Sequence, residues 1–173
     1  METNIHIKQI KVSILRLPMT VPFVTSFGEV KDKTTILVKV TDNDGVIGWG
    51  EAPTLLYPLY TSESTEVAYV ALTKYLIPRI LGQKIRHPSD IYSYWDHLKG
   101  YNFSRGAIEN ALWMIYSLKK KKSISSLIRG TKNKVPVGDS IGIQPSIQKT
   151  LDDIALRLSE HYRRIKIKIK PGW

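Results

Sequence analysis

The sequence predicts an α+β protein in which an antiparallel sheet with helices is followed by the beginning of a parallel (β/α) barrel. A strong turn at Asp42-Asn-Asp-Gly45 joins two strand-like stretches, helical patterns run from residue 63 to 121, and residues 135–173 read strand, helix, strand. Strands joined by a helix at this spacing normally run parallel. Because two strands cannot close a barrel, which needs about eight, we expect a first domain over residues 1–132 and a truncated barrel over 133–173.

The composition is that of an ordinary globular protein. The 173 residues are 42% hydrophobic and 24% charged, and the absence of cysteine excludes disulfides and thiolate metal sites. A chain of this length can bury roughly 70% of the surface that its unfolded form exposes. No signal peptide and no apolar run long enough to span a membrane is visible, so we expect a cytoplasmic protein with no membrane contact.

The net charge is +11, from 26 lysines and arginines against 15 acidic residues. Such an excess raises the question of a nucleic acid or another polyanion as a partner. The basic residues are scattered, however, apart from the run Lys119–Lys122, and no nucleic-acid-binding motif accompanies them. A nucleic-acid partner is therefore not expected.

The antiparallel sheet is predicted from three strands. Residues 5–17 nearly alternate branched apolar and polar side chains, which is typical of a strand. Residues 34–41 and 46–52 flank the turn at Asp42–Gly45 and predict a hairpin. Together these segments predict a three-stranded antiparallel meander.

A loop is expected at residues 21–28, because Pro18 and Pro22 interrupt the strand pattern. It carries two aromatic and two hydroxyl side chains, and a loop this apolar usually packs against or covers something. Two interpretations stay open: Phe23 and Phe27 pack under the loop, or the loop is a lid over a ligand.

Helices are expected over residues 63–81, 88–98 and 104–121. The first follows the capping residues Thr61–Glu66 and ends at Gly82, and the third carries an apolar stripe.

The second part of the chain reads as a strand over 135–143, a helix over 148–161 and a strand that begins at Arg164. In this last strand, isoleucines at 165, 167 and 169 alternate with lysines at 166, 168 and 170. Since a strand points alternate side chains to opposite faces, one face is apolar and the other basic. The lysines either discourage pairing at a sheet edge or point into a barrel, where one acts as a base.

A series of short motifs resembles one branch of the enolase superfamily, the o-succinylbenzoate synthases and N-acylamino acid racemases, which are muconate-lactonizing-like proteins. The resemblance covers essentially the whole chain, as the N-terminal part of such a protein. The motifs are Pro22-Phe23, Ser26-Phe27-Gly28, Gly48-Trp-Gly-Glu51, Pro58-x-Tyr60, Ile77-Pro78, Ala107-Ile-Glu109, Ala111-Leu-Trp113, Gly138-x-Ser140-Ile-Gly142, Arg164-Ile-Lys-Ile-Lys168 and Pro171-Gly-Trp173.

The resemblance implies an α+β capping domain, a modified (β/α) barrel, and a site between them. It implies that Lys168 takes the proton α to a substrate carboxylate, with Lys166 beside it. A lysine with its ordinary pKa near 10.4 is mostly protonated at neutral pH, and a second ammonium on the same strand face would lower the pKa of the base by repulsion. The superfamily places Mg²⁺ on the enediolate that develops.

The resemblance also assigns a substrate pocket for a small-molecule carboxylate. The expected lining residues are Phe23, Ser26, Phe27, Leu55 and Tyr60 from the capping domain and Ser140 from the first barrel strand.

Some family features are not found in this sequence. The family's acidic metal ligands and its second essential lysine lie on later barrel strands, and none of them occurs in this chain, so no metal ligand is assigned. The family's usual Asp, an apolar residue and a Gly are replaced by Met114, Asp139 and His161. Asp139 either faces solvent or leaves a buried charge that strains its strand.

Three functions stay open at this point. The first is the N-terminal portion of an o-succinylbenzoate synthase-like lyase of menaquinone biosynthesis, expected to be inactive alone, or of an N-acylamino acid racemase. The second is a non-catalytic remnant or binding module, which associates with itself or with a C-terminal remainder that completes the barrel. The third is a basic protein that binds polyanions.

Overall fold

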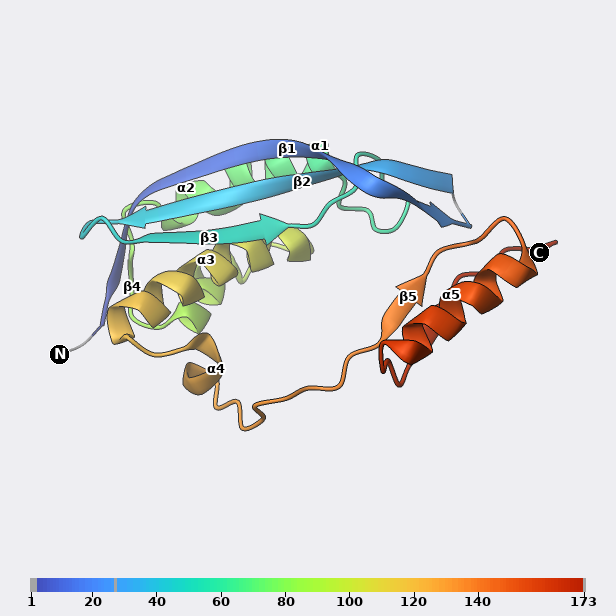
Figure 1. Cartoon of the computed structure of the whole chain (residues 1–173). Helices are drawn as coiled ribbons and strands as arrows, with labels where there is room; N and C mark the ends of the chain where they lie inside the picture. Colours follow the sequence, from blue (N-terminus) through green and yellow to red (C-terminus); the bar gives the residue numbers. More distant parts are fainter. Residues whose placement is uncertain (1–2, 27, 173) are drawn as a thin grey trace. The chain divides into compact units, whose positions relative to one another are not determined.

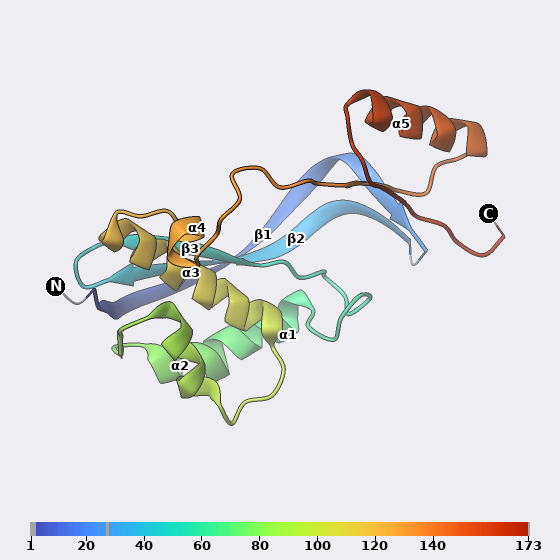
Figure 2. The same ribbon diagram turned by 90° about the horizontal axis from the view of Figure 1, so that it is seen from below.

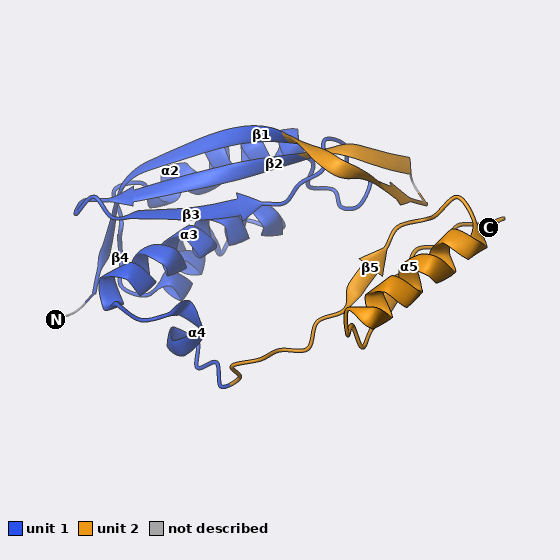
Figure 3. Ribbon diagram, in the orientation of Figure 1, with its two compact units in different colours: residues 1–16, 34–131 blue, residues 17–33, 132–173 orange. Residues whose placement is uncertain are grey.

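The computed structural model describes residues 3–26 and 28–172, and its elements are labelled in Figure 1. The chain divides into two compact units, coloured in Figure 3. Unit 1 comprises Met1–Arg16 and Thr34–Thr131, and unit 2 comprises Leu17–Lys33 and Lys132–Trp173. Unit 2 thus contains the expected barrel segment together with the tip of an N-terminal hairpin.

The N-terminal sheet has four strands in the order β3-β2-β1-β4. They are β1 (Ile5–Thr25), β2 (Gly28–Asp42), β3 (Ile47–Ala52) and β4 (Lys84–Ile85). The hairpin of β2 and β3 is antiparallel, with Ile36 opposite Ala52 and Thr41 opposite Ile47. The predicted antiparallel sheet is therefore confirmed, and the two-residue strand β4, antiparallel to β1, adds to the three expected strands.

The loop expected at residues 21–28 is wrong, because β1 continues to Thr25 and β2 begins at Gly28. Proline is tolerated in a strand where no ladder hydrogen bond is needed from its nitrogen. Pro18 and Pro22 therefore do not end β1.

The core of unit 1 lies between the sheet and its helices. The inward side chains Ile36, Val38 and Val40 of β2 are fully buried, and so are Ala107 and Ala111 of α3 (Asn102–Lys120). Figure 1 shows α3 lying along β3, and Figure 2 shows α1, α2 and α3 side by side. This alternation of buried residues explains why the strand and helix patterns were visible in the sequence.

Close packing of β3 on α3 depends on two glycines. A Cβ added at Gly48 would lie 2.0 Å from the carbonyl oxygen of Ala111, and one added at Gly50 would lie 1.8 Å from that of Ala107. No side chain fits in such spaces, so the helix backbone rests directly on these residues.

The helix expected over residues 63–81 is a continuous helical run of three parts. These are α1 (Thr65–Val70), the π-helical η1 (Ala71–Leu76) and α2 (Ile77–Ile80). Pro78 lacks the amide hydrogen that an α-helix would use at this position, and the π-helical turn directly precedes α2.

The remaining helices of unit 1 differ in type and length from the prediction. The segment expected as a helix over 88–98 is the 3₁₀ helix η2 (Pro88–Trp95), and the helix expected over 104–121 is α3. The short helix α4 (Ile124–Leu127) was not predicted. None of the helices in the described part of the chain is both long enough and apolar enough to cross a membrane.

Lys119, near the C-terminal end of α3, joins the helix to the β2–β3 turn. Its ammonium donates hydrogen bonds to Asp42 Oδ2 (2.5 Å), Asp44 Oδ2 (2.7 Å) and the carbonyl oxygen of Asn4 (2.8 Å). The hydrogen bond and charge of Lys119 lower the pKa of Asp44. Burial opposes protonation of Lys119, but its bonds to both aspartates outweigh this and raise its pKa.

Unit 2 contains the predicted parallel strand–helix–strand unit. It consists of β5 (Asp139–Ile141), α5 (Ile147–Ser159) and β6 (Ile165–Ile167), and β5 and β6 are parallel. Both strands are shorter than expected, because each has few hydrogen-bonding partners in the described part of the chain. The predicted division of domains at residue 132 stays a prediction.

Three helices end with a residue other than glycine in the left-handed conformation: Lys121 (φ 53°), Arg129 (φ 61°) and His161 (φ 68°). After α5, the amide of His161 bonds to the carbonyl oxygen of Leu158 (3.0 Å) and the amide of Tyr162 bonds to that of Arg157 (3.1 Å). This is the Schellman arrangement, in which glycine is usual at the position of His161.

Candidate active site

The candidate site is the face of the β5–β6 sheet that carries the lysines of the final strand. Ser140 lies opposite Lys166 in the parallel register. Lys168 donates its backbone amide to the carbonyl oxygen of Ile141 (3.0 Å), which extends the ladder one residue past β6. Since side chains alternate between faces, one face is shared by Gly138, Ser140, Gly142, Arg164, Lys166 and Lys168.

Ser140 and Lys166 line a common hollow of about 540 Å³ at the beginning of the two strands, together with Gly138, Asp139, Arg164 and Ile165. Lys166 is exposed and Lys168 is half-buried, whereas Ile169 on the opposite face is 66% exposed. Lys168 is therefore more enclosed than its apolar neighbour, which is unusual for a cationic side chain.

The tip of the β1–β2 hairpin lies against the end of β5. The amide of Ile143 donates a hydrogen bond to the carbonyl oxygen of Val24 (3.1 Å). Phe23 is half-buried, and its ring lies next to the α-carbon of Gly142. Ser26 is exposed at the turn, and Phe27 lies outside the described residues.

Leu55 and Tyr60, the other two expected lining residues, belong to unit 1. They line a small cavity of about 20 Å³ together with Glu63 and Phe103. The Leu55 carbonyl accepts a hydrogen bond from the amide of Thr65 (2.9 Å). The structure thus groups Phe23, Ser140, Lys166 and Lys168 in unit 2 and these two residues in unit 1.

Glu63 is a buried residue that sequence analysis missed. Its carboxylate accepts hydrogen bonds from the amides of Phe103 (2.9 Å) and Ser104 (2.8 Å) and from the Ser104 hydroxyl (2.5 Å). It therefore caps the N-terminus of α3 from another segment, where the helix dipole favours a negative charge. In the sequence, Glu63 stands among the capping residues before α1, and no local pattern indicates its bonds to the N-terminus of α3.

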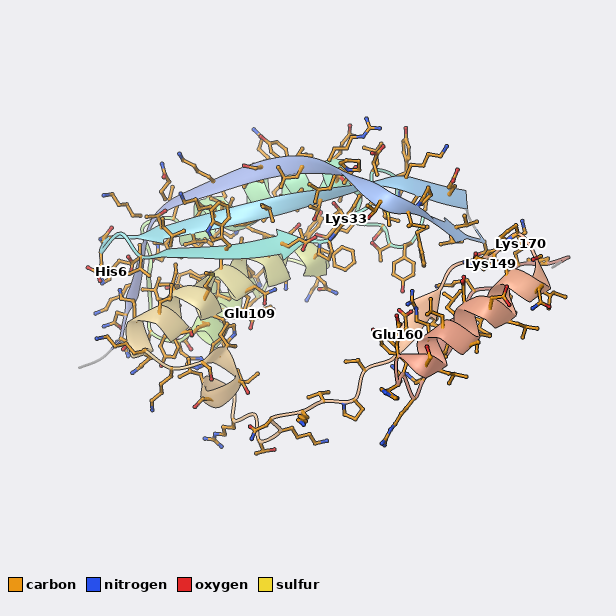
Figure 4. All side chains as sticks on the ribbon, viewed as in Figure 1. His6, Lys33, Glu109, Lys149, Glu160 and Lys170 are labelled. Carbon is orange, nitrogen blue, oxygen red and sulfur yellow. The ribbon has the colours of Figure 1, made fainter. Side chains whose placement is uncertain are left out.

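Asp139 neither faces solvent freely nor forms an unpaired buried charge. Its Oδ2 atom lies 2.5 Å from Nε of Arg157, on α5, and Arg157 also contacts Glu160 (2.7 Å). Figure 4 labels Glu160 at one end of α5 and Lys149 at the other. The hydrogen bond to Glu160 and the charge of Glu160, with a smaller contribution from Asp139, raise the pKa of Arg157.

Met114 and the Glu109 motif serve the packing of unit 1. Met114 Sδ accepts a weak hydrogen bond from the amide of Trp49 (3.4 Å). Glu109, labelled in Figure 4, accepts hydrogen bonds from Tyr92 Oη (2.6 Å) and Trp113 Nε1 (3.2 Å). Burial, with the bond to Glu109, raises the pKa of Tyr92 to about 12. These motif residues connect η2 to α3 and are not part of the candidate site.

A larger hollow, of about 860 Å³, lies at the other end of the β5–β6 unit. It is formed by residues that precede β5 and follow α5, among them Lys134, Arg157 and Arg163. Active sites of (β/α) barrels lie at the C-terminal ends of the strands, where Lys168 lies, so we do not assign the candidate site to this hollow.

A magnesium site does not fit the residues that the structure describes. Residues 3–26 and 28–172 contain no cluster of three or more His, Cys, Asp or Glu that could hold a metal ion. Oxygen ligands from carboxylates are what Mg²⁺ prefers, and the candidate face is basic.

The comparison with protein families identifies the larger, N-terminal part of the chain. Residues 9–129 match the N-terminal domain of the mandelate racemase and muconate lactonizing enzymes. The chain belongs to this family, within the enolase superfamily. The fold class expected from the motifs is confirmed, since structures of family members cover nearly the whole chain.

Two curated family members are similar along almost the entire chain. The o-succinylbenzoate synthase of Geobacillus kaustophilus is 36% identical over 169 residues, which are 98% of this chain and 45% of that protein. The N-succinylamino acid racemase of Thermus thermophilus is 34% identical over 168 residues, 97% of this chain and 45% of that protein. The chain therefore spans less than half the length of these relatives.

Solved structures in the superfamily have the same fold. A member of unknown function from Enterococcus faecalis superposes with a TM-score of 0.86 at 32% identity, over 99% of this chain and 46% of that one. A mandelate racemase/muconate lactonizing enzyme-like protein from Roseovarius nubinhibens, solved in complex with magnesium, has a TM-score of 0.85 at 25% identity, over 96% and 45%.

Proposed function

We propose that this chain supplies the base-carrying part of an o-succinylbenzoate synthase-like active site. The observation that carries the proposal is the row of basic side chains on one face of β6, opposite Ser140 and Gly142 and beside the Phe23 hairpin tip. In this proposal Lys168 is the base, Lys166 is its neighbour, and Phe23, Ser26, Phe27, Leu55, Tyr60 and Ser140 contact the substrate.

The reaction begins with proton abstraction from the carbon next to the substrate carboxylate. The Lys168 amine, in its neutral form, takes this proton, and the electron pair of the C–H bond moves toward the carboxylate to give an enediolate. In the synthase reaction the C–O bond of a hydroxyl group then breaks, and the hydroxyl leaves as water after gaining a proton. The product is 2-succinylbenzoate, a precursor of menaquinone.

The positive charge of the candidate face also suits a carboxylate substrate. Substrates of this class are anions, and the face with Arg164, Lys166 and Lys168 attracts anions by Coulomb interaction. Mg²⁺, the expected cofactor of the family, would stabilise the enediolate. Its ligands would have to come from residues outside those described here, either from a C-terminal remainder or from a separate chain that completes the barrel.

An N-acylamino acid racemase is the alternative, supported by the similarity to the Thermus thermophilus enzyme. Racemisation uses the same first step, but a proton returns to the opposite face of the carbon. A non-catalytic remnant or binding module is the remaining alternative, because residues 3–26 and 28–172 contain no cluster of three or more side chains that could hold a metal ion. We place the protein in the cytoplasm in each case.

The test joins this chain to the C-terminal part of a relative. The 173-residue chain is assayed with Mg²⁺ as it stands, and as the N-terminal part of a chimera with the remaining residues of the Geobacillus kaustophilus synthase. The proposal predicts dehydration of the cyclohexadiene carboxylate by the chimera alone. Faster racemisation of N-succinylamino acids would favour the alternative reaction, and a folded chimera without either activity would contradict both.

A further inference from the structure

On the shared face, one strand carries small residues and its neighbour carries large ones. On the shared face, β5 and the residues beside it carry Gly138, Ser140 and Gly142, and β6 and its neighbours carry the long basic side chains of residues 164, 166 and 168. Gly142 follows the Ile141–Ile167 pair, so it is next in register to Lys168. The strand opposite the lysines therefore presents almost no side-chain bulk.

Gly142 is not needed for its backbone conformation. It is absent from the described glycines with positive φ, so other residues could adopt its backbone angles. Its lack of a side chain matters because the hairpin tip lies close to its α-carbon. A Cβ added there would lie 3.3 Å from the carbonyl oxygen of Val24 and 3.4 and 3.5 Å from Cδ2 and Cε2 of Phe23.

The hairpin tip is held at this position by its backbone. The Ile143 amide bonds to the Val24 carbonyl (3.1 Å), and the Thr25 hydroxyl bonds to the Gly28 carbonyl (3.0 Å) across the turn. Thr25 is buried. These bonds hold the Phe23 ring beside Gly142, the residue next in register to Lys168.

We infer that Gly142 is a specificity-determining residue, whose missing side chain sets how far the Phe23 ring recedes from the substrate beside Lys168. The inference rests on the proposed function and adds to it a residue that shapes the pocket for the substrate ring. A flat aromatic wall suits a carboxylate that carries a planar unsaturated ring, because the ring can stack on it. The methyl group of Gly142→Ala would contact the Phe23 ring and crowd the Val24 carbonyl oxygen, at 3.3 Å, so the hairpin tip and its ring would have to shift toward this substrate.

The first arm of the test uses the chain alone and nuclear magnetic resonance. The Phe23 ring should shift the α-proton resonances of Gly142, and Phe23→Leu should remove that shift. Gly142→Ala should speed hydrogen exchange at the Ile143 amide, because displacement of the hairpin weakens its bond to Val24. Unchanged Gly142 resonances in Phe23→Leu would overturn the packing on which the inference depends.

The second arm measures kinetics in the chimera. Gly142→Ala should raise KM for the cyclohexadiene carboxylate about tenfold, in the range that one methyl group is worth in a pocket, and leave kcat nearly unchanged. KM for an N-succinylated aliphatic amino acid should rise less. In the Phe23→Leu background, Gly142→Ala should raise KM much less, because leucine leaves room for the new methyl group.

The outcomes separate the inference from the proposed function. If Gly142→Ala and Phe23→Leu changed KM independently, so that their effects multiplied, the specificity role would be overturned even if the resonances showed Phe23 packed on Gly142. Gly106→Ala is the control, since a Cβ at Gly106 meets nothing within 4 Å. An inactive wild-type chimera would overturn the proposed function and the specificity role together, whereas the resonance experiment would still report on the packing.

Discussion

His161 shows at the scale of one residue how this chain departs from its family. It has φ of 68° directly after α5, a conformation that costs an L-residue about 1–2 kcal/mol. The sequence already marked His161 as a replacement for glycine, but only the two hydrogen bonds that close the helix reveal why glycine is usual there.

We predict that His161→Gly stabilises the protein by roughly 0.5–1 kcal/mol, the relief of left-handed strain less the larger unfolded-state entropy of glycine. Urea denaturation monitored by circular dichroism measures the change. The control is Ala155→Gly, an exposed position inside α5, which should lose roughly 0.8–1 kcal/mol because glycine is a poorer helix former than alanine. Destabilisation by His161→Gly would contradict the assigned strain.

Asp44 gives a prediction for pH. Its pKa is lowered by the hydrogen bond and charge of Lys119, so ionised Asp44 stabilises the folded state above its ordinary pKa near 3.8. This stabilisation is lost as the pH falls through the lowered folded-state value. Asp44→Asn should therefore lower the thermal midpoint at neutral pH and make progressively less difference in acid.

The control for this prediction is Lys119→Met, in which Asp44→Asn should have little effect at any pH. A pH-independent effect of Asp44→Asn in the natural background would show that Lys119 is not its partner.

At the scale of elements, β3 and α3 form the most closely packed pair in unit 1. The sequence predicted both elements, because alternation and the apolar stripe are local patterns. It did not predict their closeness, which depends on Gly48 and Gly50 meeting the carbonyl groups of Ala111 and Ala107. The glycines appeared only as a family motif, since contacts between distant segments leave no local pattern.

Gly50→Ala is expected to destabilise the protein by about 3 kcal/mol or more, because the added methyl group forces helix and strand apart. Gly106→Ala, on the same helix α3 but with nothing near its α-carbon, should stabilise it by about 0.8–1 kcal/mol through helix propensity. Chemical denaturation compares the two. Equal effects would contradict the close approach of α3 and β3.

The candidate site was predictable in part for the same reason. Alternation placed Lys166 and Lys168 on one face, and the register of β5 and β6 brings Ser140 opposite Lys166. The extension of β1 through Pro22 was not predicted, because a strand's tolerance of proline depends on where its partner lies. The contact of Phe23 with Gly142 follows from that extension, and so it was also missed.

At the scale of the whole molecule, the chain corresponds to less than half of its curated relatives. It spans 45% of the Geobacillus kaustophilus synthase, and β5 and β6 form a sheet of two strands among those described. Several apolar side chains of unit 2 are exposed, among them Ile167, Ile169, Leu151 and Leu158. Unpaired strand edges and exposed apolar surface favour association.

We therefore predict that the isolated chain associates with itself, which light scattering over a concentration series measures as a mass above that of the monomer. Ile169→Lys should shift the mass toward the monomer. Leu81→Lys, at an exposed position of unit 1, should not. A monomer at every concentration would contradict the prediction.

The proton abstraction by Lys168 is tested most directly by kcat of the chimera with Lys168→Ala. A base contributes roughly 10²–10⁴-fold to a rate, so kcat for the cyclohexadiene carboxylate should fall by that factor while the chimera remains folded by circular dichroism. The Gly106→Ala chimera should keep its full rate. A Lys168→Ala chimera that dehydrates the substrate as fast as the parent would contradict the account.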